Sequence, residues 1–163
     1  MMEMTQRQLS FIGFIIAFFL VTFGYYCEYV VGCRPCLLCL IQRNIFIAIG
    51  IIFLIAFLHS YARRSVRSYA IVTLILTSFG MLTSGRQLWL QHMPNTAPEM
   101  CVPGLGYLFR EFPLIEAMQM IITGSQDCGR IDWQFLNISM AGWAMVFFLI
   151  FFIASIKILF SRR

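Results

Sequence analysis

The chain has 163 residues, of which 60% are hydrophobic and 12% charged, with a net charge of +5 and a mean hydropathy of +0.82. A soluble domain of this size has too little interior to bury so much apolar surface, so the composition excludes an ordinary soluble protein and predicts one that resides in lipid. The excess positive charge does not indicate nucleic-acid binding, because the pattern lacks a basic face interleaved with exposed aromatic residues.

Four segments are predicted to cross the membrane as helices, at about residues 9–26, 37–58, 69–90 and 138–157. Each is close to the ~20 residues that a helix needs to cross ~30 Å of hydrocarbon. The first is longer than the ~7–15-residue core of a signal peptide and no small-x-small cleavage site follows it, so we expect a retained anchor. The chain is therefore predicted to be an all-α membrane protein, a four-transmembrane-helix bundle forming a single domain over residues 1–163.

Basic residues indicate how the bundle is oriented. They precede the first segment, separate the second from the third and follow the fourth: Arg7, Arg63, Arg64, Arg67, Lys157, Arg162 and Arg163. The positive-inside rule makes these regions cytoplasmic, together with both termini. The loops at about 27–36 and 91–137, which hold every cysteine except Cys39, then lie on the outer side. An oxidising exterior, such as the bacterial periplasm, permits disulfides there.

The long second loop contains an amphipathic pattern. Apolar residues after Pro113 follow the spacing of one helix face: Leu114, Ile115, Met118, Ile121 and Ile122. The pattern is too short to span a membrane, so we expect a short interfacial helix on the outer membrane surface. The alternative is a loop helix packed on the bundle.

The densest motif is "CRPCLLCLIQR" at residues 33–43. Pro35 suits the first position of a helix, which puts Cys36 and Cys39 in the opening turn, where free N–H groups and the helix dipole favour a thiolate. Arg43 follows Cys39 by four residues, so it lies one turn deeper on the same face. A cation within a span marks a functional site by default, and the motif predicts a redox-active pair.

A metal site is the first alternative for these cysteines. The spacing of Cys36 and Cys39 is half of a common zinc site, whose other half needs a second such pair or two histidines. Cys101 and Cys128 are far apart in the sequence, and His92 is the one histidine expected on the outer side. We therefore expect no metal, and a structural or metal-binding membrane protein stays as the alternative.

The other cysteines leave two questions open. Cys101 and Cys128 are expected to form a disulfide in the outer loop, which either staples the loop or exchanges with other thiols. Cys27 ends the first span among aromatic residues, as a packing cysteine would. Cys33 either pairs with Cys27 or competes for exchange with Cys36.

The order of these features resembles the bacterial disulfide bond formation protein B (DsbB) family over nearly the whole chain. The resemblance rests on these motifs: "PCLLCLIQR" (35–43), "QLWLQH" (87–92), Cys101, "DC" (127–128) and "WQFLNISMAGW" (133–143). Cys27 and Cys33 depart from the pattern, because the family mechanism uses four cysteines.

The resemblance implies a quinone-dependent thiol oxidase that re-oxidises a periplasmic DsbA-like thioredoxin-fold protein. Cys101–Cys128 would be the disulfide attacked by the reduced partner, with Cys101 receiving the mixed disulfide. Cys128 would then attack Cys36, and Cys39 would donate electrons to ubiquinone or menaquinone from the respiratory pool. Each step is thiolate attack on a disulfide.

The expected quinone contacts are Arg43, His92 and Arg86. A quinone is apolar but gains electrons and protons, so a cation near lipid suits it, and His92 is a candidate proton donor. Structural packing of His92 and snorkelling of Arg86 to headgroups are the alternatives. A quinone-linked reductase like vitamin K epoxide reductase also fits, because the direction of electron flow depends on the partner's potential.

Overall fold

The structure is a computed structural model that describes residues 6–33, 35–59, 63–93, 105–116, 119, 124, 126–131 and 133–160. Four long helices dominate it: α1 (Gln6–Tyr26), α2 (Leu37–Leu58), α3 (Arg63–His92) and α6 (Met140–Phe160). Stretches long and apolar enough to cross a membrane cover Arg7–Val31, Leu37–Leu58, Arg67–His92 and Met140–Phe160. The predicted four-helix membrane bundle is confirmed.

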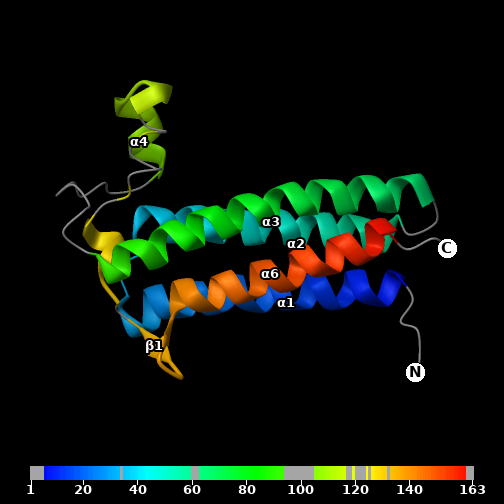
Figure 1. The fold of residues 1–163 in the computed structure, drawn as a ribbon, viewed down its shortest axis with the longest axis horizontal. Coiled ribbons are helices and arrows are strands. Elements are labelled where there is room, and N and C mark those ends of the chain that lie inside the picture. The colour runs from blue at the N-terminus through cyan, green and yellow to red at the C-terminus, as the bar shows by residue number, and fades with distance from the viewer. Residues whose placement is uncertain are drawn as a thin grey trace.

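The helices run up and down the bundle (Figure 1). α2 packs between α1 and α3, and α6 packs on α3. The start of α1 and the end of α6 lie at one end of the bundle, and the shorter elements lie at the other (Figure 1). Arg7, Arg67 and Lys157 fall near the first end. This arrangement agrees with the expected topology, whereas the side of the membrane that each end faces stays a prediction.

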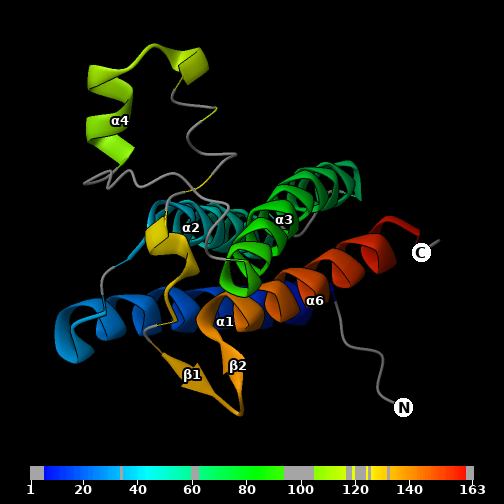
Figure 2. The ribbon, with the colours of Figure 1, turned by 60° about the vertical axis from the view of Figure 1, so that its left-hand side comes forward.

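Short elements occupy the other end: the π-helix η1 (Cys27–Val31), the helix α4 (Leu105–Glu111), the 3₁₀-helix η3 (Gln126–Gly129), and strands β1 (Gln134–Phe135) and β2 (Ile138–Ser139). The strands form an antiparallel hairpin that leads directly into α6 (Figure 2). Its turn residues, Leu136 and Asn137, both have positive φ, 53° and 62°. This is the backbone of a two-residue hairpin turn. The all-α prediction missed it, because strands of two residues carry no alternating pattern.

The helix expected after Pro113 lies only partly within the described residues. α4 ends before Pro113, and residues 114–116 and 119 are also helical. Met118, Ile121 and Ile122 lie outside the described residues. Leu114 and Ile115 are 69% and 76% exposed. Figures 1 and 2 show α4 standing apart from the bundle. The position of this segment on a membrane surface stays a prediction.

Aromatic packing joins the helices in the bundle interior. Phe46 of α2 stacks face to face on Phe148 of α6, with ring centroids 4.1 Å apart, and both rings are buried. The outer faces carry large apolar side chains that are more than 60% exposed: Phe18, Phe19, Ile75 and Leu82. Surface of this kind is stable only against lipid.

Gly80 lets α3 approach α6 closely. A Cβ atom at this position would lie 2.6 Å from Cε1 of Phe148, whose ring is held in place by Phe46. Small residues serve this purpose in membrane bundles, where van der Waals contact drives helix association.

We predict that Gly80→Ala destabilises the bundle by about 1–3 kcal/mol, because the added methyl group must displace a packed ring. Gly85→Ala on the same helix is the matched control, since nothing lies within 4 Å of the added Cβ there. Thermal unfolding in detergent should show a lower melting temperature for Gly80→Ala and no decrease for Gly85→Ala. Equal melting temperatures would contradict the close approach.

Candidate functional site

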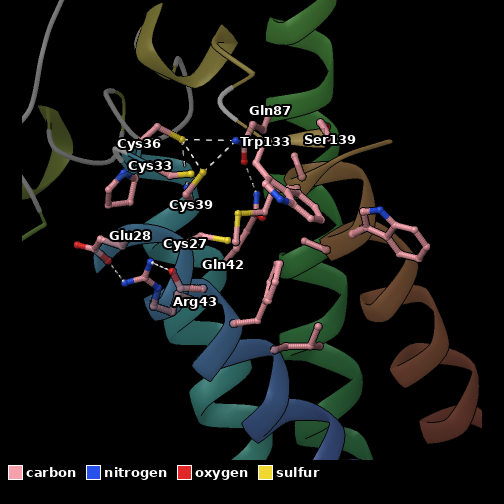
Figure 3. A pocket seen from close by; sticks show the side chains of 18 of the residues that line it. Cys27, Glu28, Cys33, Cys36, Cys39, Gln42, Arg43, Gln87, Trp133 and Ser139 are labelled. Atoms are coloured by element: carbon pink, nitrogen blue, oxygen red, sulfur yellow. Dashed lines mark hydrogen bonds and ion pairs between the residues drawn. The ribbon is translucent and has the colours of Figure 1, made fainter. Parts of the chain in front are cut away.

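A cavity of about 430 Å³ opens among the helices at the end where the short elements lie. Most of its wall is apolar, from α1, α2, α6 and the hairpin region: Phe19, Leu20, Phe23, Phe46, Trp133, Trp143 and Phe147. Its polar and sulfur-bearing part includes Cys36, Cys39, Gln42, Arg43 and Gln87 (Figure 3). The cavity therefore combines a surface suited to an apolar molecule with a small group of reactive side chains.

Cys36 and Cys39 meet at the start of α2. Cys36 is the N-cap residue, with an extended backbone (φ −73°, ψ 168°), and its sulfur accepts a hydrogen bond from the N–H of Cys39 at 3.4 Å. The helix begins at Leu37, so Pro35 precedes the cap instead of opening the helix as expected. The reason is that Cys36 satisfies a free N–H group of the first turn. Its thiol also donates to the sulfur of Cys39 at 2.9 Å.

Two buried glutamines, for which the sequence predicts no role, extend this network. The side-chain amide of Gln87 donates to the sulfur of Cys39 at 3.0 Å, and Gln42 donates to the carbonyl oxygen of Gln87 at 2.8 Å. Because Gln42 holds that oxygen, the Gln87 amide is turned towards the sulfurs (Figure 3). A hydrogen bond to the charged form of a thiol favours that form. The sequence signal that could have pointed to Gln42 and Gln87 is that a polar side chain within an apolar span often has a functional role.

Cys128 of η3 reaches the same place from the far end of the chain. It is fully buried, and η3 packs on α3 and α2. Hydrogen bonding with Cys128 and with Cys39, together with burial, raises the pKa of Cys36, so this thiol keeps its proton at neutral pH. Cys128, Cys36 and Cys39 therefore lie in contact as a series of three sulfurs.

Gly124 helps to hold η3 in this position. Its φ is +71°, a backbone conformation that residues other than glycine rarely adopt. A Cβ atom at this position would also lie 2.6 Å from Cδ1 of Leu90 on α3. The chain before Cys128 can therefore approach α3 closely only with glycine at this position.

Arg43 lines the cavity and is held by the end of α1. Its guanidinium forms an ion pair with Glu28, donates to the carbonyl oxygen of Gly24 at 3.3 Å and lies 4.4 Å from the ring centroid of Tyr25. The Arg43 side chain is only 12% exposed. Glu28 balances its charge, which lowers the cost of placing a cation inside a bilayer boundary.

The remaining predicted site residues lie elsewhere. Arg86 is half-buried and His92 is exposed, both on α3, and neither is among the residues that line the cavity. Nδ1 of His92 lies 2.8 Å from the carbonyl oxygen of Leu88 in its own helix. Cys101 lies outside the described residues. The roles expected for these three residues stay predictions.

Comparison with known proteins places this geometry in a family. The family model described as "Disulfide bond formation protein DsbB" matches residues 6–158. The chain belongs to the DsbB family. This DsbB-family chain is 39% identical over 144 residues to disulfide bond formation protein B of an Azoarcus species, covering 88% of this chain and 86% of that protein.

Other DsbB relatives match with similar coverage. Identity is 36% over 143 residues with the protein of Methylococcus capsulatus (88% of this chain, 87% of the relative) and 33% over 159 residues with that of Marinobacter nauticus (98% and 95%). No solved structure matches. Membership in the DsbB family supports a disulfide-forming membrane oxidoreductase, and the sulfur series and cavity lie within the matched residues.

We predict that Gln87→Leu slows alkylation of Cys39 by a membrane-permeant maleimide about tenfold or more. The substitution removes a hydrogen bond to a sulfur that carries charge when it reacts, which is typically a loss of about 1.5–3 kcal/mol. The rate can be followed by mass spectrometry of quenched samples.

The matched control is Thr83→Val, one turn earlier on α3. Thr83 is also buried, but its hydroxyl donates to Gly80 of its own helix. An equal loss of rate in both variants would show that packing, and not the amide donor, accounts for the effect.

Proposed function

We propose that this protein re-oxidises a periplasmic DsbA-like thioredoxin-fold protein and passes the electrons to membrane quinone through two cysteine pairs. The observation that carries the proposal is the contact series from Cys128 through Cys36 to Cys39, which ends beside an apolar cavity. We further propose a bacterial inner-membrane location with both termini cytoplasmic and the cysteines periplasmic.

The electrons would move by successive thiolate attacks. A thiolate of the reduced partner attacks Cys101 and breaks its bond to Cys128, which leaves as a thiolate. Cys128 attacks Cys36 and breaks the Cys36–Cys39 bond, so Cys39 leaves as a thiolate. The partner's second thiolate then resolves the first mixed disulfide and releases Cys101. Finally, Cys101 attacks Cys128, which restores that disulfide and leaves Cys36 and Cys39 holding two electrons.

The hydrogen bonds around the inner pair support this division of labour. Cys36 has a raised pKa and donates to Cys39, so it is suited to holding a proton. Cys39 accepts from Cys36 and from the amide of Gln87, so its sulfur is suited to carrying negative charge. Since both sulfurs line the cavity, the electron-rich one can act on a molecule bound there.

The cavity residues fit a quinone. Aromatic side chains such as Phe23, Phe46 and Trp143 offer contacts for a flat apolar ring, and the guanidinium of Arg43 offers a cation for an oxygen that gains charge. A bound quinone supplies an acceptor for two electrons and two protons. His92 and Arg86 do not line the cavity. We propose that they act from the outer end of α3, His92 by delivering protons and Arg86 as a further contact for the quinone.

The decisive experiment is quinone reduction by Cys39→Ser with a reduced dithiol protein as electron donor. We expect the decrease in quinone absorbance seen with the unaltered protein to disappear, because serine cannot form the disulfide that transfers electrons. The melting temperature and metal content of both proteins should be measured in parallel. Unaltered turnover would refute the assignment, and bound metal that is lost in Cys39→Ser would favour the metal-binding alternative.

We also predict that Arg43→Lys raises the KM for quinone about tenfold, equivalent to about 1.4 kcal/mol, with a smaller effect on kcat. A lysine cannot pair with Glu28, reach Gly24 and lie over Tyr25 at once, so its charge is no longer held at the cavity wall. Arg67→Lys, an exposed residue at the opposite end of the bundle, is the control and should leave the KM unchanged. A KM that is unchanged in Arg43→Lys would remove this residue from the quinone site.

A further inference from the structure

Two cysteines take no part in the proposed relay, yet they line the same cavity as Cys36 and Cys39. Cys27 begins η1 and is 1% exposed, whereas Cys33 is half-buried and follows the last turn of η1. A lone buried cysteine is usually a packing residue. Here two cysteines lie beside a redox pair, so their mutual geometry decides whether they share its chemistry.

The backbone brings Cys27 and Cys33 together. The carbonyl oxygen of Cys27 accepts hydrogen bonds from the N–H groups of both Gly32 and Cys33, the latter at 3.0 Å. Gly32 has φ +81°, which turns the chain back over the wide π-helical turn. A direct N–H···O=C bond between two residues is compatible with the Cα separation of about 4.4–6.8 Å found in disulfides.

Both side chains also line the same cavity, and both thiols are free in this structure. Figure 3 shows Cys33 next to Cys36 and Cys39, and Cys27 on the side towards Arg43. Cys33 therefore lies between Cys27, with which it could form a disulfide, and the Cys36–Cys39 pair of the proposed relay.

We propose that Cys27 and Cys33 form an auxiliary disulfide pair that exchanges with Cys36–Cys39. The inference rests on the proposed function for its route of oxidation. In the exchange, the Cys33 thiolate attacks the sulfur of Cys36, the Cys36–Cys39 bond breaks and Cys39 leaves as a thiolate. Cys27 then attacks Cys33 and releases Cys36. Two electrons and two protons thus pass from Cys27 and Cys33 to Cys36 and Cys39, and the reverse sequence returns them.

Such a pair would enlarge the electron capacity of the protein when no quinone is bound. The chain has six cysteines, so the fully oxidised form would hold three disulfides and accept about three two-electron equivalents. The four cysteines of the relay alone would accept about two. Because Cys27 is buried and Cys33 only half-buried, Cys33 would be the member of the pair that reacts first with other sulfurs.

Titration of the quinone-free oxidised protein with dithiothreitol tests the capacity. We expect about three equivalents for the unaltered protein and about two for Cys27→Ser/Cys33→Ser. Acid quenching, alkylation and cleavage after Glu28 separate the two cysteines into different peptides, so a linked peptide pair reports their disulfide. In the matched variant Cys27→Ser, Cys33 should become open to alkylation in the oxidised protein.

The variant Cys36→Ser/Cys39→Ser keeps Cys27 and Cys33 but removes the disulfide through which we propose that quinone oxidises them. Oxidised glutathione should still join Cys27 to Cys33 in this variant, whereas added quinone should not. Alkylation of both cysteines in oxidised unaltered protein, or equally rapid oxidation by quinone in the variant, would overturn the proposal. Failure of the proposed function appears differently, as a glutathione-formed Cys27–Cys33 bond in a protein that never reduces quinone.

Discussion

The start of α2 is the point on which the rest of the site depends. The first N–H groups of a helix have no partner within the helix, and at the boundary of a membrane water cannot be relied on to supply one. Here the sulfur of Cys36 caps the helix. The cap fixes that sulfur against Cys39, and the packing of η3 then sets Cys128 against Cys36. The need to cap the first turn of α2 therefore also positions the reactive sulfur atoms.

The groups around the sulfurs are mostly neutral, and the low dielectric of the site explains why. An unpaired charge beside Cys39 would be costly there, whereas the amides of Gln42 and Gln87 satisfy each other and still leave a donor for the sulfur. The cation of Arg43 is instead set at the cavity wall with Glu28 as its counter-ion. The thiols thus receive hydrogen bonds from uncharged donors, and the charged pair of Arg43 and Glu28 lies at the cavity wall.

The end of α1 contributes more than a membrane span. Gly24 contributes its carbonyl oxygen, which accepts a hydrogen bond from the guanidinium of Arg43 at 3.3 Å. The π-helical turn that follows carries Glu28, the counter-ion of Arg43, and closes onto Cys33. Wide turns of this kind often mark functional sites. One irregular segment therefore supplies the ion pair and the two additional cysteines.

By itself, the sequence determined the four spans, because long apolar runs with at most one charge must lie in lipid, and it singled out Cys36, Cys39 and Arg43 by their helical spacing. Only the tertiary structure decided that Cys128 lies against Cys36 and that Gln87 faces Cys39. These contacts join elements that are distant along the chain, and they depend on tertiary packing, such as the close approach of Gly124 to Leu90, that leaves no local pattern in the sequence. The same holds for the hairpin before α6, whose turn lacks the glycine that usually signals one.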